Sequence, residues 1–227
     1  MFQKKEKDKI EIYLRKYLDP DKKITVIDAG AHKGDFIDQL KKHYKIQKTV
    51  LIEPIAHLAN FLKLKYSNEN IFVFQNAISD KDFNHVEFRI NEYEETSSIL
   101  EVRSEMKELG NINTRLSKKE KLITRTLDSI AQELSLDIVD LIKIDVQGVE
   151  HLVLEGGKNV LGKSRYVWIE LSLKPLYVDS SVFHDIYNMM EKNEFILLEL
   201  SPGHRSPSNE LLQVDALFAN PKLTNDI

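Results

Sequence analysis

The chain has no cysteine among its 227 residues, and glycine, proline and tryptophan are scarce, with eight, six and one residues. Without cysteine the protein can form no disulfide, no thiolate ligand for a metal and no thiol nucleophile. The sequence also contains no internal repeat and no low-complexity segment. The chemistry of any site must therefore come from other side chains and from the backbone.

Neither sign of charge is in large excess, and no apolar run is long. The 32 basic and 36 acidic residues give a net charge of -4, which provides no overall attraction to phosphate backbones, so nucleic acid is not an expected partner. The apolar runs are too short to cross a bilayer, and no apolar stretch follows the basic N-terminal residues as in a secretory signal. We therefore expect a cytoplasmic protein without a membrane span.

Apolar runs alternate with helical periodicities along the chain, which is typical of an α/β fold. The length predicts one domain over 1–227. An apolar helical face that continues to Leu18 predicts an introductory helix within 1–20. No heptad pattern or apolar patch indicates an oligomeric state. We predict helices on both faces of a mostly parallel sheet, with strands at 24–27, 49–52, 71–75, 138–144, 166–171, 195–200 and 211–219.

Two segments depart from this alternation. The loop 201–209 is too short for a crossover helix, so the last strand must be antiparallel to the one before it. Residues 78–126 contain predicted strands at 85–90 and 122–126 around a polar stretch, and we interpret them as an insertion over the sheet that contributes to a substrate pocket.

The turn after the first strand carries Asp28, Gly30 and Gly34 before a predicted helix. Glycines at such a turn allow backbone amides and a helix N-terminus to approach a ligand. A dinucleotide fingerprint needs three glycines, and here there are two with a carboxylate ahead of them. Asp28 would repel a phosphate, but it suits the α-ammonium group of S-adenosylmethionine.

The next two strand ends add polar groups to the same edge of the sheet. Glu53 can accept hydrogen bonds from both ribose hydroxyls, and Asn76, with Ala77 beside it, can contact the adenine. The alternative is that the glycines only form a tight turn and that the acids cap helices. The presence of both acids favours a site for a nucleotide-like cofactor.

A second dense motif, Lys143-Ile-Asp145-Val-Gln147-Gly148-Val-Glu150, follows the strand 138–144. The carboxyl ends of parallel strands meet at one edge, so Asp145 should face the cofactor turn. A glycine after the strand-end acid permits close approach by a substrate. The alternative is that Asp145 and Glu150 only favour a helix N-terminus.

Together these motifs resemble the FkbM-type methyltransferases, which are S-adenosylmethionine-dependent enzymes that typically methylate hydroxyl oxygens of sugars or polyketides. The resemblance covers residues 24–219 and implies a Rossmann-like class I methyltransferase fold, with Asp145 as the active-site acid. It rests on the two motifs above, on Ile-Glu53-Pro54, Asn76-Ala77-Ile-Ser-Asp80, Thr126-Leu-Asp128 and Val214-Asp-Ala-Leu-Phe218. The implied cofactor-binding residues are Asp28, Gly30, Gly34, Glu53 and Asn76, to which we add Ala31, His32, Pro54, Ala77 and Asp145.

Two positions depart from the family pattern. Residue 32 is His where the family usually has Asn, and residue 147 is Gln where it usually has Glu. The missing charge at Gln147 weakens the case for a divalent cation, and we predict no metal site. A variant in which Asp145 and Glu170 hold magnesium that lowers the acceptor pKa remains an alternative.

For catalysis we assign Asp145 as the base that takes the proton of an acceptor hydroxyl. His204, in the loop between the last two strands, is the second candidate, because imidazole titrates near neutrality. Glu150 and Lys143 are expected to orient Asp145, and His32 and His151 are weaker candidates.

The acceptor is predicted to be a hydroxyl of a sugar, a glycan or another small metabolite. An N-methyltransferase and a non-catalytic cofactor-binding or interaction module remain alternatives, and a dehydrogenase is less favoured. The sequence lacks the Asn-Pro-Pro-aromatic run expected for methylation of exocyclic amino groups. The absence of cysteine excludes the covalent methylation of cytosine at carbon 5.

Overall fold

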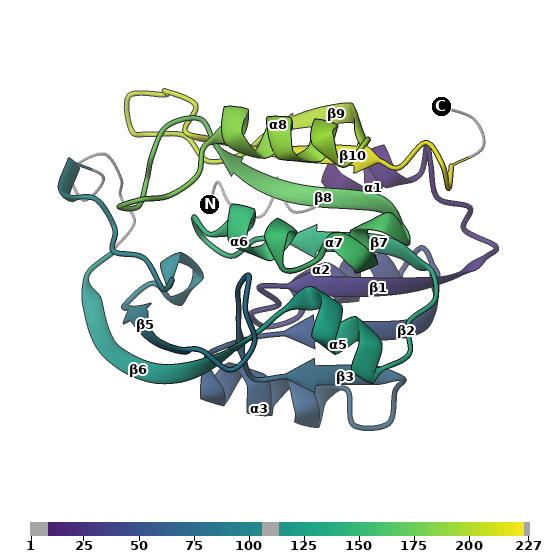
Figure 1. Cartoon of the computed structure of the whole chain (residues 1–227), viewed down its shortest axis with the longest axis horizontal. Helices are drawn as coiled ribbons and strands as arrows, with labels where there is room; N and C mark the ends of the chain where they lie inside the picture. Colours follow the sequence, from purple (N-terminus) through teal and green to yellow (C-terminus); the bar gives the residue numbers. More distant parts are fainter. Residues whose placement is uncertain (1–8, 106–113, 225–227) are drawn as a thin grey trace.

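The computed structural model describes residues 9–105 and 114–224. Within them, the main sheet has seven strands in the order β3-β2-β1-β7-β8-β10-β9 (Figure 1). All neighbours are parallel except at β10, which is antiparallel to both β8 and β9. The predicted sheet with its antiparallel last strand is therefore confirmed. The strands are β1 (Lys23–Ala29), β2 (Lys45–Ile52), β3 (Ile71–Phe74), β7 (Val139–Ile144), β8 (Ser164–Ser172), β9 (Ile196–Pro202) and β10 (Gln213–Ala219).

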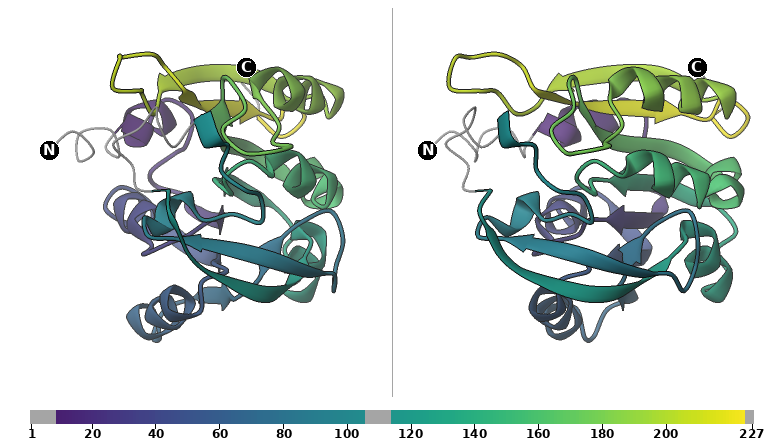
Figure 2. Two further views of the ribbon diagram at one scale, coloured as in Figure 1. Left: turned by 90° about the vertical axis from the view of Figure 1, so that its left-hand side faces the viewer. Right: turned by 60° about the vertical axis from the view of Figure 1, so that its left-hand side comes forward.

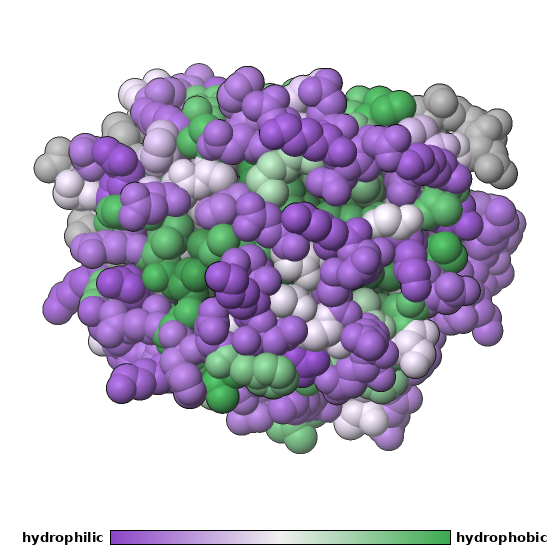
Figure 3. All heavy atoms as spheres, viewed as in Figure 1, coloured by the Kyte–Doolittle hydropathy of each residue, from purple (hydrophilic) through white to green (hydrophobic). Residues whose placement is uncertain are grey.

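Helices cover both faces of this sheet, as predicted. Successive residues of a strand point to opposite faces, so Val26 packs with α1, α2 and α3, whereas Ile27 packs with α5 to α8. The latter helices lie in front of the sheet in Figure 1, and Figure 3 shows that mostly hydrophilic residues cover this side. No helix in the described part of the chain is long and apolar enough to cross a membrane. The helices are α1 (Lys9–Leu14), α2 (Asp35–Lys41), α3 (Ala56–Lys65), α5 (Leu127–Glu133), α6 (Glu150–Glu155), α7 (Lys158–Gly162) and α8 (Phe183–Lys192).

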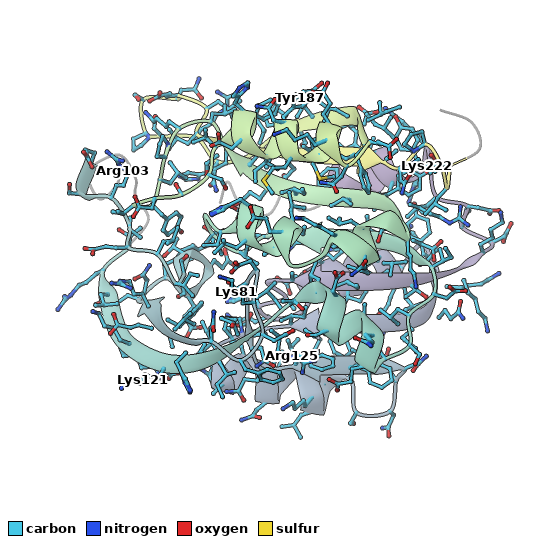
Figure 4. The ribbon with its side chains drawn as sticks, in the orientation of Figure 1. Lys81, Arg103, Lys121, Arg125, Tyr187 and Lys222 are labelled. Carbon is cyan, nitrogen blue, oxygen red and sulfur yellow. The ribbon has the colours of Figure 1, made fainter. Side chains whose placement is uncertain are left out.

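The predicted insertion forms a second, three-stranded sheet in the order β4-β6-β5. Turned by 90° from Figure 1, the molecule presents β5 and β6 in front of the main sheet (Figure 2). Arg125, labelled in Figure 4, lies over the ring of Phe74 and bonds to Glu133, so it joins this small sheet to β3 and α5. The elements are β4 (Ala77–Ile78), β5 (His85–Asn91), the 3-10 helix η2 (Glu94–Thr96) and β6 (Leu116–Arg125).

Several boundaries differ from the predicted ones. β6 begins at Leu116 rather than at 122. The first half of this strand is exposed and therefore lacks the alternation of apolar and polar residues that would predict a strand. Backbone pairing with β5 and the Lys119–Glu87 ion pair (2.8 Å) hold it in place. β2 begins at Lys45 rather than at 49, and its first four residues include only one apolar side chain, Ile46. α1 ends at Leu14 rather than at 18, and the first eight residues of the predicted introductory segment lie outside the described residues. α7 was not predicted.

A local side-chain contact sets the start of α5. Thr126 caps α5, because its hydroxyl oxygen accepts a hydrogen bond from the Ser129 amide at 3.0 Å. This bond satisfies one of the donors that a helix N-terminus leaves without an intrahelical partner. The capped helix then buries Leu127 and Ile130 against the main sheet.

Gly30→Ala is expected to destabilise the fold. Gly30 has a φ of 89°, and an added Cβ would lie 1.9 Å from the carbonyl oxygen of Asp145. Strain and overpacking together should lower the free energy of unfolding by at least about 2 kcal/mol, as measured by urea denaturation. Gly162→Ala is the control, because no atom lies within 4 Å of its added Cβ. Equal stability of the two variants would contradict the close packing of the turn on β7.

Candidate active site

A cavity of about 360 Å³ opens at the carboxyl ends of the parallel strands. Open α/β sheets bind ligands at this edge, and the volume is within the range of small-molecule sites. The turns after β1, β2 and β7 form one side of the cavity, and the segment around η2 forms another. Residues at the ends of β8 and β10 close the far end. The structure therefore brings together the turn after β1, the three later strand ends and the loop 201–209, which are the regions that the sequence predicted to converge.

The turn after β1 is held tightly against its neighbours. The amides of Gly30 and Ala31 both donate to the carbonyl of Ile52, at 3.0 and 3.1 Å, and the amide of Asp145 donates to the carbonyl of Ala29 at 2.9 Å. Gly34 adopts a φ of 78° immediately before α2. Gly30, Ala31 and the following His32 line the cavity. Gly34 is not among the lining residues, and it sets the start of the helix instead.

Glu53 lies in the cavity wall with its carboxylate fixed in orientation. The side chain is 4% exposed, and its two oxygens accept hydrogen bonds from the amides of Ile55 and His32, each at 2.8 Å. Burial raises the pKa of Glu53 to about 7, although the two amides partly oppose this rise. Each carboxylate oxygen can accept a further hydrogen bond, so Glu53 can bind a pair of neighbouring hydroxyls.

Asp28 lies beneath the cavity rather than in its wall. It is fully buried and is not one of the lining residues, so the expected direct contact with an ammonium group is not what this geometry provides. One of its oxygens accepts a hydrogen bond from Nζ of Lys143 at 3.1 Å, and the other has no partner among the described residues. Burial raises the pKa of Asp28, and the charge of Lys143 opposes this shift.

Lys143 connects Asp28 to the cavity. Its Nζ also donates to the carbonyl of Gly30 at 3.3 Å and lies 3.4 Å from a carboxylate oxygen of Asp145. Burial alone would lower the pKa of Lys143, but Asp28 and Asp145 hold it above its usual value. The side chain therefore stays protonated and forms a cationic bridge between two carboxylates.

The other predicted cofactor residues also line the cavity. Pro54 lies after β2, and Asn76 and Ala77 lie after β3. The amide nitrogen of Asn76 donates to the carbonyl of Ile123 at 3.0 Å, so a contact with a ligand falls to its oxygen. Nδ1 of His32 lies 3.7 Å from the carboxylate of Glu95, in η2. His32 therefore links the turn to the insertion.

Asp145 and Glu170 lie at the far end of the cavity. The side-chain nitrogen of Gln147 donates to both carboxylates, at 2.7 and 3.0 Å. Glu170 also accepts from the side-chain nitrogen of Gln213 at 2.6 Å and lies opposite Asp215 in the β8–β10 register. Burial raises the pKa of Glu170 well above its usual value, and the charges of Asp145 and Asp215 add to this rise.

The remaining catalytic candidates lie in different surroundings. His204 lines the cavity from the loop between β9 and β10, as predicted. Glu150 is buried at the start of α6, outside the cavity wall, and its carboxylate accepts a hydrogen bond from the amide of Gly148 at 3.0 Å. Nδ1 of His151 is buried without a partner among the described residues, and this side chain is also absent from the cavity wall.

The structure does not support the magnesium alternative. No group of three or more acidic or histidine side chains that could hold a metal occurs in residues 9–105 and 114–224. The amide nitrogen of Gln147 bridges Asp145 and Glu170, the two proposed ligands, and a nitrogen that donates two protons cannot coordinate a cation.

Sequence reasoning missed the residues that complete the far end, namely Gln147 as a contact and the pair Gln213 and Asp215. Gln213 and Asp215 are two residues apart on one strand and therefore share a face. An assumed antiparallel register between β8 and β10 could then have placed Asp215 opposite Glu170. The contribution of η2 gave no comparable signal, because its three residues follow no apolar period.

Replacement of Glu150 by Gln is expected to change how stability depends on pH. Burial raises the pKa of Glu150 to about 7 from 4.5, so the folded state binds more protons than the unfolded state between these values. The wild type should therefore lose up to about 3 kcal/mol relative to Glu150→Gln as the pH rises from about 4.5 to about 8. Urea unfolding of both proteins across this range measures the difference, with Glu155→Gln, an exposed site on the same helix, as the control. A difference that does not change with pH would contradict the assignment.

Comparisons with known proteins are consistent with this geometry. Over 131 residues the chain is 29% identical to the 2-O-methyltransferase NoeI of Sinorhizobium fredii. The matched region covers 55% of this chain and 53% of that protein. The chain thus spans about half the length of this curated relative.

Two solved structures share the fold. An FkbM methyltransferase from Methylobacillus flagellatus has a TM-score of 0.53 and 17% identity, over 86% of this chain and 43% of that one. A Listeria monocytogenes protein described as an S-adenosylmethionine-dependent methyltransferase has a TM-score of 0.55 and 11% identity, over 94% and 98%. Residues 28–197 match the model of the methyltransferase FkbM domain, and the chain therefore belongs to the FkbM methyltransferase family.

Proposed function

We propose that this protein transfers the methyl group of S-adenosylmethionine to a hydroxyl oxygen of a sugar, a glycan or another small metabolite. The observation that carries the proposal is that Glu53 and Asp145, two oriented carboxylates from different strand ends, line one cavity within a methyltransferase FkbM domain. The name of the relative, a 2-O-methyltransferase, supports an oxygen as the acceptor atom.

The residues present fit the proposed cofactor. Glu53 is already oriented by two backbone amides and has acceptor capacity left for the ribose hydroxyls. The turn from Gly30 to His32 and the oxygen of Asn76 would hold the remaining polar parts. The wall contains more carboxylates than cations, which favours a positively charged ligand. When bound, S-adenosylmethionine supplies an electrophilic methyl group on a sulfonium.

The chain's own contribution to the reaction is positioning and proton removal. When the acceptor oxygen is held in line with the methyl carbon, the entropy cost of bringing the two reactants together is met on binding, so the activation barrier of the transfer is lower. Asp145 accepts the hydroxyl proton, and Lys143 and Gln147 fix its carboxylate from two sides. His204 borders the same cavity and is the second candidate for the base.

The proposed acceptor pocket lies between the far end of the cavity and the segment around η2. Residues 93–97 of the insertion line the same cavity as Asp145 and Gln147, so we assign this segment to the wall that selects the acceptor within a single domain. The proposal also includes the cytoplasm as the place of the reaction.

Asp145→Asn is expected to reduce turnover by a factor on the order of 10² to 10⁴, because it removes the base and keeps the shape of the side chain. S-adenosylhomocysteine release with a panel of methyl glycosides and polyols measures turnover, and calorimetry checks that cofactor affinity is retained. His204→Gln, measured in parallel, separates the two base candidates. Wild-type turnover in Asp145→Asn would remove Asp145 as the base. Tight cofactor binding without methyl transfer to any acceptor, amines included, would favour a non-catalytic module.

Binding of S-adenosylmethionine is expected to tighten as the pH rises through about 7. Ionisation of Glu53 near this pH creates a carboxylate that accepts both ribose hydroxyls and attracts the sulfonium. Glu53→Ala should weaken binding by about tenfold or more, because the hydroxyls lose their partners in a partly dry site. Glu53→Gln should remove the pH dependence. Calorimetry at several pH values tests this, and unchanged affinity in Glu53→Ala would refute the ribose assignment.

A further inference from the structure

Gln147 makes an unusual set of contacts at the far end of the cavity. Its side-chain nitrogen donates one hydrogen bond to Asp145 (2.7 Å) and one to Glu170 (3.0 Å). Its side-chain oxygen lies 2.8 Å from the hydroxyl of Tyr177, and its backbone carbonyl accepts a bond from the hydroxyl of Ser98 at 2.7 Å. Gln147 therefore contacts its own turn, strand β8 and the two loop segments that carry Ser98 and Tyr177.

The two carboxylates dictate the orientation of the amide. If the amide were rotated by half a turn, its oxygen would face Asp145 and Glu170, and acceptors would oppose acceptors. The hydroxyl of Tyr177 can either donate or accept, so it is compatible with the observed orientation. Both protons of the Gln147 amide are thus committed, one to each carboxylate.

The backbone of Gln147 is held in a conformation that has a cost. Its φ is 60°, in the left-handed region that residues with a Cβ rarely adopt, and Gly148 follows with a φ of 102°. Such a conformation is strained and persists only where surrounding contacts enforce it. Here it directs the amide between the two acids.

Two carboxylates that converge in a partly dry cavity repel each other unless a proton, a cation or a hydrogen-bond donor lies between them. Glu170 shows the repulsion, because the charge of Asp145 contributes to the rise in its pKa. Lys143 lies on the other oxygen of Asp145, 3.4 Å away, and therefore leaves the space between the two acids to Gln147. A neutral amide can link both acids through two hydrogen bonds without adding charge.

We propose that Gln147 is a positioning residue that takes the place of a divalent cation: its amide cross-links Asp145 and Glu170 and so fixes the acid that faces the acceptor. The inference rests on the proposed function for the role of Asp145, and the cross-link itself does not. A glutamate at this position would have the same shape but would place three carboxylates together, which is a set of ligands suited to a divalent cation. Residue 147 therefore determines whether this end of the cavity holds a proton donor or a metal.

The first experiment measures Mn²⁺ binding to the purified protein by electron paramagnetic resonance, without cofactor or acceptor. Gln147→Glu is expected to bind one Mn²⁺ at least about tenfold more tightly than the wild type. Adding Glu170→Gln to this variant should abolish the gain, which assigns the ion to this site. No gain in Gln147→Glu, or a site of equal affinity in the wild type that Glu170→Gln removes, would overturn the proposal.

The second experiment follows the two side-chain amide protons of Gln147 by nuclear magnetic resonance, assigned by their loss in Gln147→Met. Asp145→Asn should shift one proton and Glu170→Gln the other, because each proton bonds to a different carboxylate. Asn159 of α7, whose side-chain nitrogen donates to Asp128 of α5 at 2.8 Å, is the internal control and should not shift. If neither proton of Gln147 responds, the cross-link does not exist in solution.

Neither measurement requires turnover, so their failure can be distinguished from failure of the proposed function. An enzyme that methylates hydroxyls but shows no response at Gln147 would refute only the cross-link. A protein with the expected metal and amide signatures but no methyl transfer would refute only the proposed function.

Discussion

The arrangement of the site depends on the ammonium group of Lys143, near the carboxyl end of the central strand β7. Nζ of Lys143 contacts the carboxylate of Asp28, the carbonyl of Gly30 and the carboxylate of Asp145. It therefore joins the ends of β1 and β7, the two strands from which the opposite halves of the cavity begin. A buried carboxylate such as Asp28 would be very unfavourable without this charge, and the turn at Gly30 packs directly on the backbone that Lys143 anchors.

The cavity concentrates negative charge that does not help the protein to fold. Glu170 and Asp215 face each other across two paired strands, an arrangement that destabilises a sheet, and burial raises the pKa of Glu53 to about 7. Folding energy from the two large apolar clusters must offset this cost. Such local conflict is expected where a site is organised for a ligand rather than for stability.

The sequence predicted those parts of the fold whose signal is local. β1 and β7 are largely apolar runs, so their positions, and that of Asp145 directly after β7 in the cavity wall, could be derived from the chain. The first half of β6 could not, because charged residues on both of its faces leave no period to detect. Asp28 was expected to face the ligand, but its direction depends on Lys143, which comes from a strand far along the chain. The contacts of Gln147 depend on a positive φ and on the register of β8 with β10, and both are set by tertiary packing.

The position of β10 between β8 and β9 has a consequence for the order of assembly during synthesis. β9 cannot join the main sheet until β10, which is translated after it, has been inserted between it and β8. β10 also brings Gln213 and Asp215 to the cavity. The half of the cavity that the turns after β1, β2 and β7 form therefore does not depend on β10, whereas the opposite half stays open until β10 is in place.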